Sequence, residues 1–428
     1  MPAISRLIQL PPFARNVLRV LGGTIIAQLL VLAATPFLSR IYTPEAFALS
    51  QSFTSIIGTL MMVACLRYEL ALTVSSREET PSLLLLCGAI TCLMATALFF
   101  FSPLLSHRSA TLFNTTALSR LGFISAIGLV ASTALNATTF LLIKEKLFTQ
   151  LAAAKIVQAV AFVAMALALA FVAKSVTGVL LADVTSRSIA FLTALAFCIP
   201  VIRGLGGARV LSRIPGIMRK YRNFPLISVP AGLLNSLGGA FNTVWMLALF
   251  DASTAGSYAI VERIISAPVG LVAGAISQVY QAEILSARTS DPALARERFR
   301  RLVMMQVKIG AIPFALLFFL SPYALPLLLG PQWRQAGVFC QILAPFQFIV
   351  FVTFPFQMVL TVMERQHLQL AWDAIRFALV SGCWFAAKAL RATPVEAIAA
   401  TAVAGGVSYL IFLAMAYRSI GQGRGAGA

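Results

Sequence analysis

The sequence predicts an all-α integral membrane protein with about twelve transmembrane helices, arranged as two six-helix lobes around a central cavity. Three observations lead to this fold class. Of the 428 residues, 59% are hydrophobic and 11% are charged, whereas about 25% of the residues in a soluble protein are charged. The apolar residues form runs of about 20, the length that crosses a hydrocarbon core as a helix. Lys and Arg lie between those runs and are divided unequally between alternate loops.

Each apolar run gives one predicted span. The spans lie near 17–38, 46–66, 82–104, 118–143, 150–172, 177–200, 225–250, 255–281, 303–321, 336–361, 368–389 and 394–417. Between the ninth and tenth spans, Pro322, Pro326, Gly330 and Pro331 interrupt the apolar run, so we expect the helix to break there.

The long basic segment 201–223 divides the spans six and six, which predicts an N-terminal lobe over 1–205 and a C-terminal lobe over 206–428. A weak internal repeat agrees with this division. TPEAFALSQS follows the first span and ASTAGSYAIV follows the seventh, and each places a small residue and an aromatic at the start of the next helix. Two similarly oriented halves are a known plan among transporters.

Orientation follows from the basic residues, because Lys and Arg are retained in cytoplasmic loops. With the N-terminus inside, the two tails, the even-numbered loops and the span ends next to them hold 21 basic residues, and the odd-numbered loops with their span ends hold seven. This bias predicts that both termini are cytoplasmic.

Charged residues within the spans are the candidate site, because ionisable groups at bilayer depth are costly and usually face a cavity or a partner. Asp183 and Arg187 are one helical turn apart in the sixth span. Glu262 and Arg263 are adjacent in the eighth span and point to different faces. We expect Arg187 and Arg263 to bind an anionic substrate, since a guanidinium matches phosphate oxygens. The carboxylates would hold the arginines or carry a coupling ion, and internal ion pairs that only fix packing are the alternative.

Other polar residues at the ends of spans or inside them extend this candidate set. For most of them a structural ion pair or a snorkelling side chain is at least as good an interpretation as substrate binding. They are Arg40, Arg67, Glu69, Asn235, Asp373 and Arg376.

Several function classes lack their sequence signals. The net charge of +19 is spread between apolar runs, which argues against a nucleic-acid partner and fits anionic membrane lipids. We find no phosphate-binding loop, no nucleophile elbow, no metal-ligand spacing and no cofactor motif, and so name no catalytic residue, metal or cofactor. A membrane polymerase or ligase would need a long loop with catalytic Arg or His, which the predicted topology lacks. The sequence therefore favours transport over enzymatic activity.

Six segments, in order along nearly the whole chain, resemble the bacterial polysaccharide and lipopolysaccharide biosynthesis proteins, the Wzx-type flippases of the multidrug/oligosaccharidyl-lipid/polysaccharide exporter (MOP) superfamily. They are TPFLSRIYTPEAFAL (35–49), LRYELAL (66–72), KYRNFPLISVPAGLLN (220–235), AGSYAIVERIISAP (255–268), GPQWRQAGVFCQILAPF (330–346) and MERQHLQLAWDAIRFAL (363–379).

The resemblance implies alternating access that carries an undecaprenyl-pyrophosphate-linked oligosaccharide across the bacterial inner membrane, for O-antigen or exopolysaccharide assembly. It also implies partners in that pathway, a polysaccharide polymerase and chain-length proteins. A relative in the same superfamily that exports drugs or other amphiphiles by cation antiport is the alternative. That alternative predicts Asp183 or Glu262 as an ion site.

Overall fold

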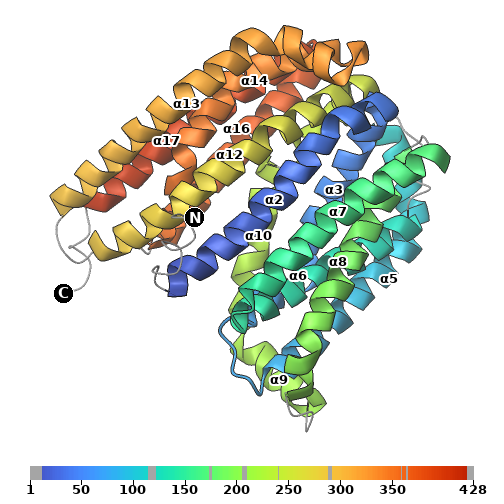
Figure 1. The fold of residues 1–428 in the computed structure, drawn as a ribbon, viewed down its shortest axis with the longest axis vertical. Helices are drawn as coiled ribbons and strands as arrows, with labels where there is room; N and C mark the ends of the chain where they lie inside the picture. Colours follow the sequence, from blue (N-terminus) through green and yellow to red (C-terminus); the bar gives the residue numbers. More distant parts are fainter. Residues whose placement is uncertain are drawn as a thin grey trace, which may run out of the picture. The chain divides into compact units, whose positions relative to one another are not determined.

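The structure is a computed structural model that describes residues 12–113, 122–172, 176–204, 210–239, 241–287, 292–357, 359–362 and 365–421. This part of the chain consists of helices joined by short turns and contains no strand (Figure 1). It divides into two compact units, Met1–Ser236 and Leu237–Ala428. The lobe boundary expected from the sequence, between residues 205 and 206, stays a prediction.

The first unit contains five long helices, a shorter one over the second predicted span, and several short helices. The elements are α2 (Pro12–Ile41), α3 (Pro44–Ala64), α4 (Tyr68–Ala71), α5 (Thr80–Phe113), α6 (Gly122–Lys144), α7 (Phe148–Val172), α8 (Val176–Gly204), α9 (Val210–Lys220), the π-helical turn η2 (Phe224–Ser228) and the start of α10 (Val229–Gly239). Helix α7 packs between α2 and α8. Gly23 permits the contact of α2 with α7, since a Cβ there would lie 2.9 Å from the Cα of Ala152.

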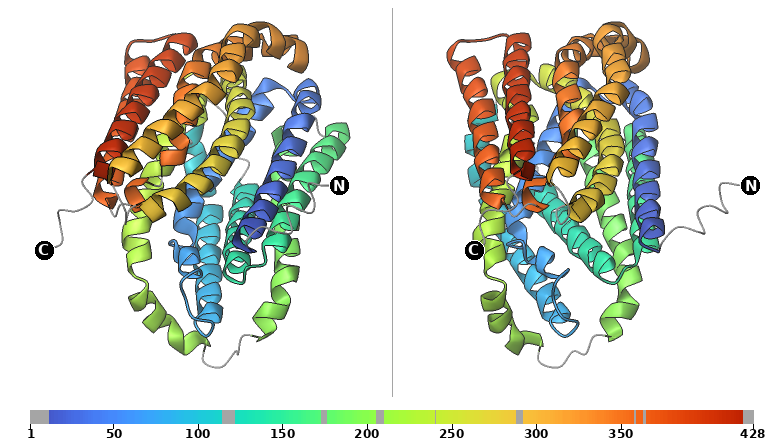
Figure 2. Two further views of the ribbon diagram at one scale, coloured as in Figure 1. Left: turned by 60° about the vertical axis from the view of Figure 1, so that its left-hand side comes forward. Right: turned by 90° about the vertical axis from the view of Figure 1, so that its left-hand side faces the viewer.

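The second unit is built from five longer helices joined by short turns. Its elements after α10 are α11 (Asn242–Leu249), α12 (Ala252–Ala287), α13 (Pro292–Leu329), η3 (Pro331–Trp333), α14 (Arg334–Thr353), η4 (Phe354–Phe356), α15 (Val359–Val362), α16 (Gln366–Ala389) and α17 (Pro394–Gly421). Helix α14 packs against α12, α13 and α17, and α16 packs against α17 (Figure 2). Aromatic rings of Phe299, Phe356, Trp372 and Phe412 fill a buried cluster in this unit.

Among the described residues, 11 helices are long and apolar enough to cross a membrane, or up to 12 if one bent pair counts as a span. This confirms the predicted all-α membrane fold. The bent pair corrects one detail, because the sequence predicted a continuous seventh span over 225–250. Instead Phe224–Gly238 and Asn242–Leu249 meet at 51°. The break follows Gly238 and Gly239, where two glycines in succession weaken a helix.

The ninth span also differs from its prediction. The sequence placed it at 303–321 and ended it at the prolines that follow. Helix α13 instead continues through Pro322 and Pro326 to Leu329, and the chain turns at Gly330, whose φ is +117°. Helix α14 supports the proline-containing part, because Gly337 lies against the Pro322 backbone and the Ser321 hydroxyl donates to the Gly337 carbonyl at 3.1 Å.

All six cysteines are free thiols. Four of them are buried, namely Cys65, Cys87, Cys198 and Cys340. Cys92 on α5 is exposed, and Cys383 on α16 is partly exposed.

Candidate functional site

Arg187 lies within the membrane-spanning part of α8, and its guanidinium is fixed from two sides. Its Nε donates to the Asp183 carboxylate at 2.9 Å, and its Nη1 donates to Ser132 Oγ on α6 at 3.3 Å. The predicted same-face pair is therefore present. The Arg187 side chain keeps 21% of its surface exposed. Because a guanidinium has five N–H donors, these two contacts leave donors for a further anion.

Arg67 and Glu69 form the second pair in the first unit. Their closest atoms, Nη1 and Oε1, are 3.8 Å apart, longer than a hydrogen bond. Glu69 is buried, with 1% of its surface exposed. The Arg67 guanidinium lies against Gly232 of α10, where a Cβ would be 2.7 Å from Nη2. Glycine at position 232 therefore allows the Arg67 guanidinium to lie this close to the α10 backbone.

Glu262 is the centre of a polar cluster in the second unit. The Tyr258 hydroxyl donates to its Oε1 and the Thr243 hydroxyl donates to its Oε2, both at 3.0 Å. Asn242 on α11 interacts with the same group and accepts a hydrogen bond from Trp384 Nε1 at 3.1 Å. Hydroxyl and amide donors hold this carboxyl group, and such neutral donors leave it able to exchange a proton or to meet a cation.

Asp373 and Arg376 are both buried on α16, with their nearest atoms 3.4 Å apart. Arg376 also donates to the Tyr409 hydroxyl at 3.3 Å, and its guanidinium carbon lies 4.7 Å from the centre of the Trp372 ring. The contacts on several sides favour the structural interpretation of this pair. Breaking a buried pair by removing one partner is typically strongly destabilising.

Three further predicted residues lie on other helices. Arg40 is exposed in the last turn of α2, Asn235 is exposed on α10, and Arg263 is half-buried on α12. Their part in substrate binding stays a prediction.

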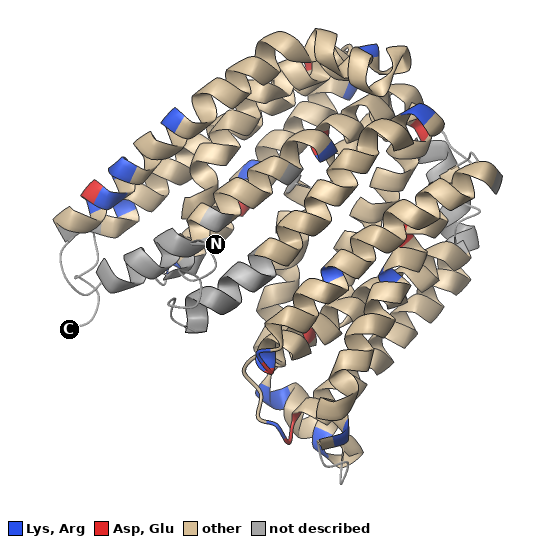
Figure 3. Cartoon of the chain, viewed as in Figure 1, with Lys and Arg blue, Asp and Glu red and all other residues tan. Residues whose placement is uncertain are grey.

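Sequence reasoning missed an ion-pair network at the end of the first unit. Figure 3 shows that charged residues are sparse along the long helices and gather around α9 and the loop beside it. Arg213 of α9 donates to the Glu78 carboxylate at 3.0 Å, and Lys220 donates to Glu79 at 2.6 Å. The Tyr221 hydroxyl donates to Glu79 at 3.0 Å. We call these five residues the α9 clasp.

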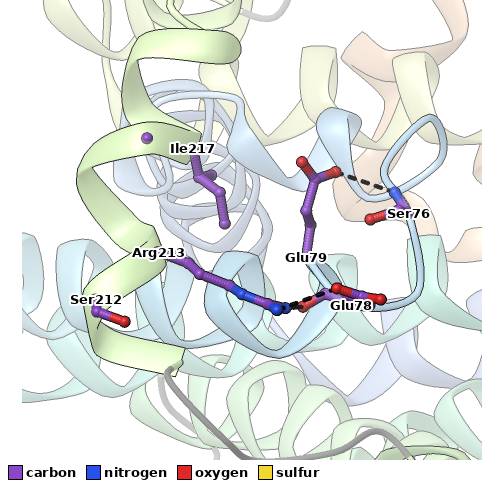
Figure 4. Close-up of a pocket in the computed structure, with 7 residues that line it drawn as sticks. Ser76, Glu78, Glu79, Ser212, Arg213 and Ile217 are labelled. Carbon is purple, nitrogen blue, oxygen red and sulfur yellow. Dashed lines mark hydrogen bonds and ion pairs between the residues drawn. The ribbon is translucent and has the colours of Figure 1, made fainter.

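The clasp borders a pocket of about 390 Å³, in which Arg213 points to Glu78 and Glu79 turns back to the Ser76 amide (Figure 4). Burial alone would raise the pKa of Glu79. The hydrogen bonds from Lys220, the Ser76 amide and Tyr221 outweigh burial and lower the pKa to about 2. The signal for α9 was present in the sequence, since Val210, Ile214 and Ile217 recur at helical spacing. The prediction that 201–223 is one basic loop is therefore wrong at Val210–Lys220, which is helical.

An apolar hollow of about 240 Å³ lies among α5, α6 and α8 within the first unit. The hydroxyls in its lining already donate to backbone carbonyls of their own helices, Thr91 to Cys87 and Thr133 to Leu129, both at 2.7 Å. The hollow therefore offers few unused polar groups, and its lining suits hydrocarbon.

The fold places the protein in a known class. A Lipid II flippase MurJ in an inward closed conformation matches with a TM-score of 0.72 at 12% identity, over 93% of this chain and 89% of that one. An inward-facing multidrug resistance MATE family transporter of the MOP superfamily matches with a TM-score of 0.73 at 13% identity, over 94% and 96% of the two chains. A MOP superfamily transporter from Pyrococcus furiosus gives 0.63 at 11%, over 96% and 97%.

The chain therefore has the fold of the MOP-superfamily transporters. Comparison with curated proteins found no match. Residues 37–337 match the model of the family described as "Polysaccharide biosynthesis protein". Since the match covers more than half of the chain, the protein belongs to the polysaccharide biosynthesis protein family, as the six sequence segments predicted.

Proposed function

We propose that the protein is a flippase, not an enzyme, that moves an undecaprenyl-pyrophosphate-linked oligosaccharide from the cytoplasmic to the outer leaflet of the bacterial inner membrane. The product would serve O-antigen or exopolysaccharide assembly. The supporting observation is a guanidinium at bilayer depth in a member of a polysaccharide family with a transporter fold. Arg187 is held by Asp183 and Ser132 and retains donors for phosphate oxygens.

The two chemical parts of such a substrate need different surroundings. The pyrophosphate is anionic and suits a partly exposed arginine that is oriented in advance, because orienting it costs no further side-chain entropy on binding. The prenyl tail is hydrocarbon, and the apolar hollow among α5, α6 and α8 suits a segment of it. In this proposal alternating access carries the head group, and both termini are cytoplasmic. A polymerase and chain-length proteins as partners stay predictions from the resemblance.

A second candidate, cation-coupled export of drugs or other amphiphiles, has one specific observation in its favour. Glu262 is a carboxyl group within a span, held by hydroxyl and amide donors. Such a group can bind a coupling cation or a cationic substrate. The two candidates differ in cargo, so an assay of the glycan itself separates them.

The test is a leaflet-resolved assay of lipid-linked glycan in cells that lack the protein and in cells complemented with variants. Lipid-linked glycan should accumulate on the cytoplasmic side without the protein. Arg187→Ala should lower export at least about tenfold, because a hydrogen bond to a charged group contributes about 1.5–3 kcal/mol. Arg187→Lys should lower export less than Arg187→Ala, since Lys keeps the positive charge but lacks the planar, bidentate donors of the guanidinium.

Arg203→Ala is the matched control, because Arg203 is exposed in the last turn of the same helix. It should export normally. Normal glycan in Arg187→Ala cells with normal protein levels would remove Arg187 from the site. An unchanged leaflet distribution in cells without the protein would refute the flippase itself.

A further inference from the structure

The connection between α3 and α4 holds an unusual backbone. Leu66 and Arg67 follow each other with φ of 49° and 61°, the left-handed region that residues with a Cβ rarely adopt. Helix α4 starts directly after these two residues. Tyr68 and Glu69 are thereby buried, with 2% and 1% of their surfaces exposed. The buried Glu69 side chain thus follows directly after two residues in a disfavoured backbone conformation.

The Glu69 carboxyl group is buried without a well-formed hydrogen bond among the described residues. No donor of another described residue reaches either of its oxygens, and the Nε of Arg67 is likewise buried without a partner there. The closest cationic atom, Arg67 Nη1, is 3.8 Å from Oε1. A buried ionised carboxylate normally accepts several hydrogen bonds, because losing water otherwise costs too much. This geometry fits a neutral carboxyl group better than an ionised one.

The elements packed around α4 offer Glu69 little charge. Helix α5 contributes Cys87, whose backbone carbonyl accepts a hydrogen bond from the Cys65 thiol. The Cys87 thiol is close enough to Glu69 to interact with it electrostatically. Tyr221, before η2, is turned to Glu79, and Lys144 at the end of α6 donates to Ser75 and Thr80. Burial raises the pKa of Glu69, although its own backbone amide and Arg67 act in the opposite direction.

We propose that Glu69 is a proton-binding site whose occupancy sets the position of the Arg67 guanidinium. With the proton bound, the pair stays apart as observed, and Arg67 lies against Gly232 at the start of the bent α10–α11 segment. When the proton leaves to water, the carboxylate attracts the guanidinium into a hydrogen-bonded pair and draws it away from α10. Proton release thus changes the packing of a broken span. Its use in coupling rests on the proposed transport function, whereas the proton site does not.

The proton site can be tested on the purified full-length protein without any transport. Thermal unfolding is measured against pH for the wild type, Glu69→Gln and the control Glu297→Gln, whose side chain is exposed on α13. A carboxyl group with a raised native pKa stabilises the fold below its unfolded pKa of about 4.3, and this contribution is lost as the pH rises through the native pKa. The Tm of Glu69→Gln relative to the wild type should therefore rise by a few degrees towards high pH.

The control should show no such trend. A Glu69→Gln difference that does not change with pH would overturn the proposal. If that variant does not fold, wild-type protein is treated with a hydrophobic carbodiimide, which reacts with protonated buried carboxyl groups, and the modified residue is located by mass spectrometry. Modification of Glu69 that decreases as the pH rises supports the site, and the absence of modification at every pH, or modification that does not change with pH, overturns it.

The coupling step needs the glycan assay described above. Export by the wild type should fall when the proton gradient is dissipated, and export by Glu69→Gln should not respond to the gradient. If the protein carries another cargo, the unfolding result still stands, so failure of the proposed function is distinguishable. If Glu69→Gln exports glycan with unchanged gradient dependence, the coupling role is lost even where the proton site is real.

Discussion

Glu79 is expected to hold α9 against the first unit, and replacing it by Gln should release that helix locally. Glu79 receives hydrogen bonds from Lys220, Tyr221 and the Ser76 amide. A pKa of about 2, against a usual value of about 4.3, corresponds to about 3 kcal/mol. The Lys220 side chain is 56% exposed, so solvent screening reduces this figure. We expect a loss of about 1–2 kcal/mol.

Hydrogen exchange of the α9 amides, followed by mass spectrometry in detergent, measures this loss. A loss of about 1–2 kcal/mol increases the open population about 5- to 30-fold, and the exchange of α9 should accelerate by the same factor. Helices outside the first unit should exchange as in the wild type. A double-mutant cycle with Lys220→Met should show that the two substitutions are not additive, because the two side chains are in contact.

The pH dependence of α9 exchange tests whether the ionised form of Glu79 is the stabilising one. A carboxylate with a lowered pKa contributes stability above its unfolded pKa, and this contribution is lost as the pH falls through the folded pKa. The ratio of exchange rates between Glu79→Gln and the wild type should therefore be largest at neutral pH and shrink below pH 5, with roughly half of the contribution lost near pH 3. Unchanged exchange of α9 at pH 7, or a ratio that grows on acidification, would refute the reasoning.

Two further outcomes follow from the structure. Gly337→Leu should lower the Tm by several degrees, because its Cβ would lie 2.8 Å from the Pro322 Cα and overpacking costs about 1–3 kcal/mol. Gly58→Leu is the control, because the space at its Cβ position is open. Equal Tm values for the two variants would contradict the prediction. If Asp183 or Glu262 carries a coupling ion, Asp183→Asn or Glu262→Gln should make glycan export independent of the ion gradient, and retained dependence would exclude that residue.

Most of the membrane architecture could be predicted from the sequence, because the requirement that a span satisfy its own backbone makes each helix a local property. One exception has a non-local cause. The prolines of α13 do not end that helix, because Gly337 of α14 packs against them. The other exception is local, since the seventh span bends at the successive glycines Gly238 and Gly239, a signal that the continuous apolar run outweighed in the prediction.

The candidate site was predictable to the extent that it is local. Asp183 and Arg187 share a face at a spacing of four, and the ion pair follows from that spacing. The contacts that decide chemistry come from distant segments, such as Ser132 for Arg187 and Gly232 for Arg67. The missing hydrogen bonds of Glu69 depend on the left-handed turn before it, and a single sequence does not reveal that turn.

The distribution of the free thiols has a practical consequence. Cys92 and Cys383 are the two with exposed surface, and one lies in each compact unit, while the other four are shielded by packing. A membrane-permeant spin label should therefore attach at two native positions in the unmutated protein. Pulsed dipolar spectroscopy on that doubly labelled molecule would then test whether the distance between the two labels changes when substrate or an ion gradient is supplied.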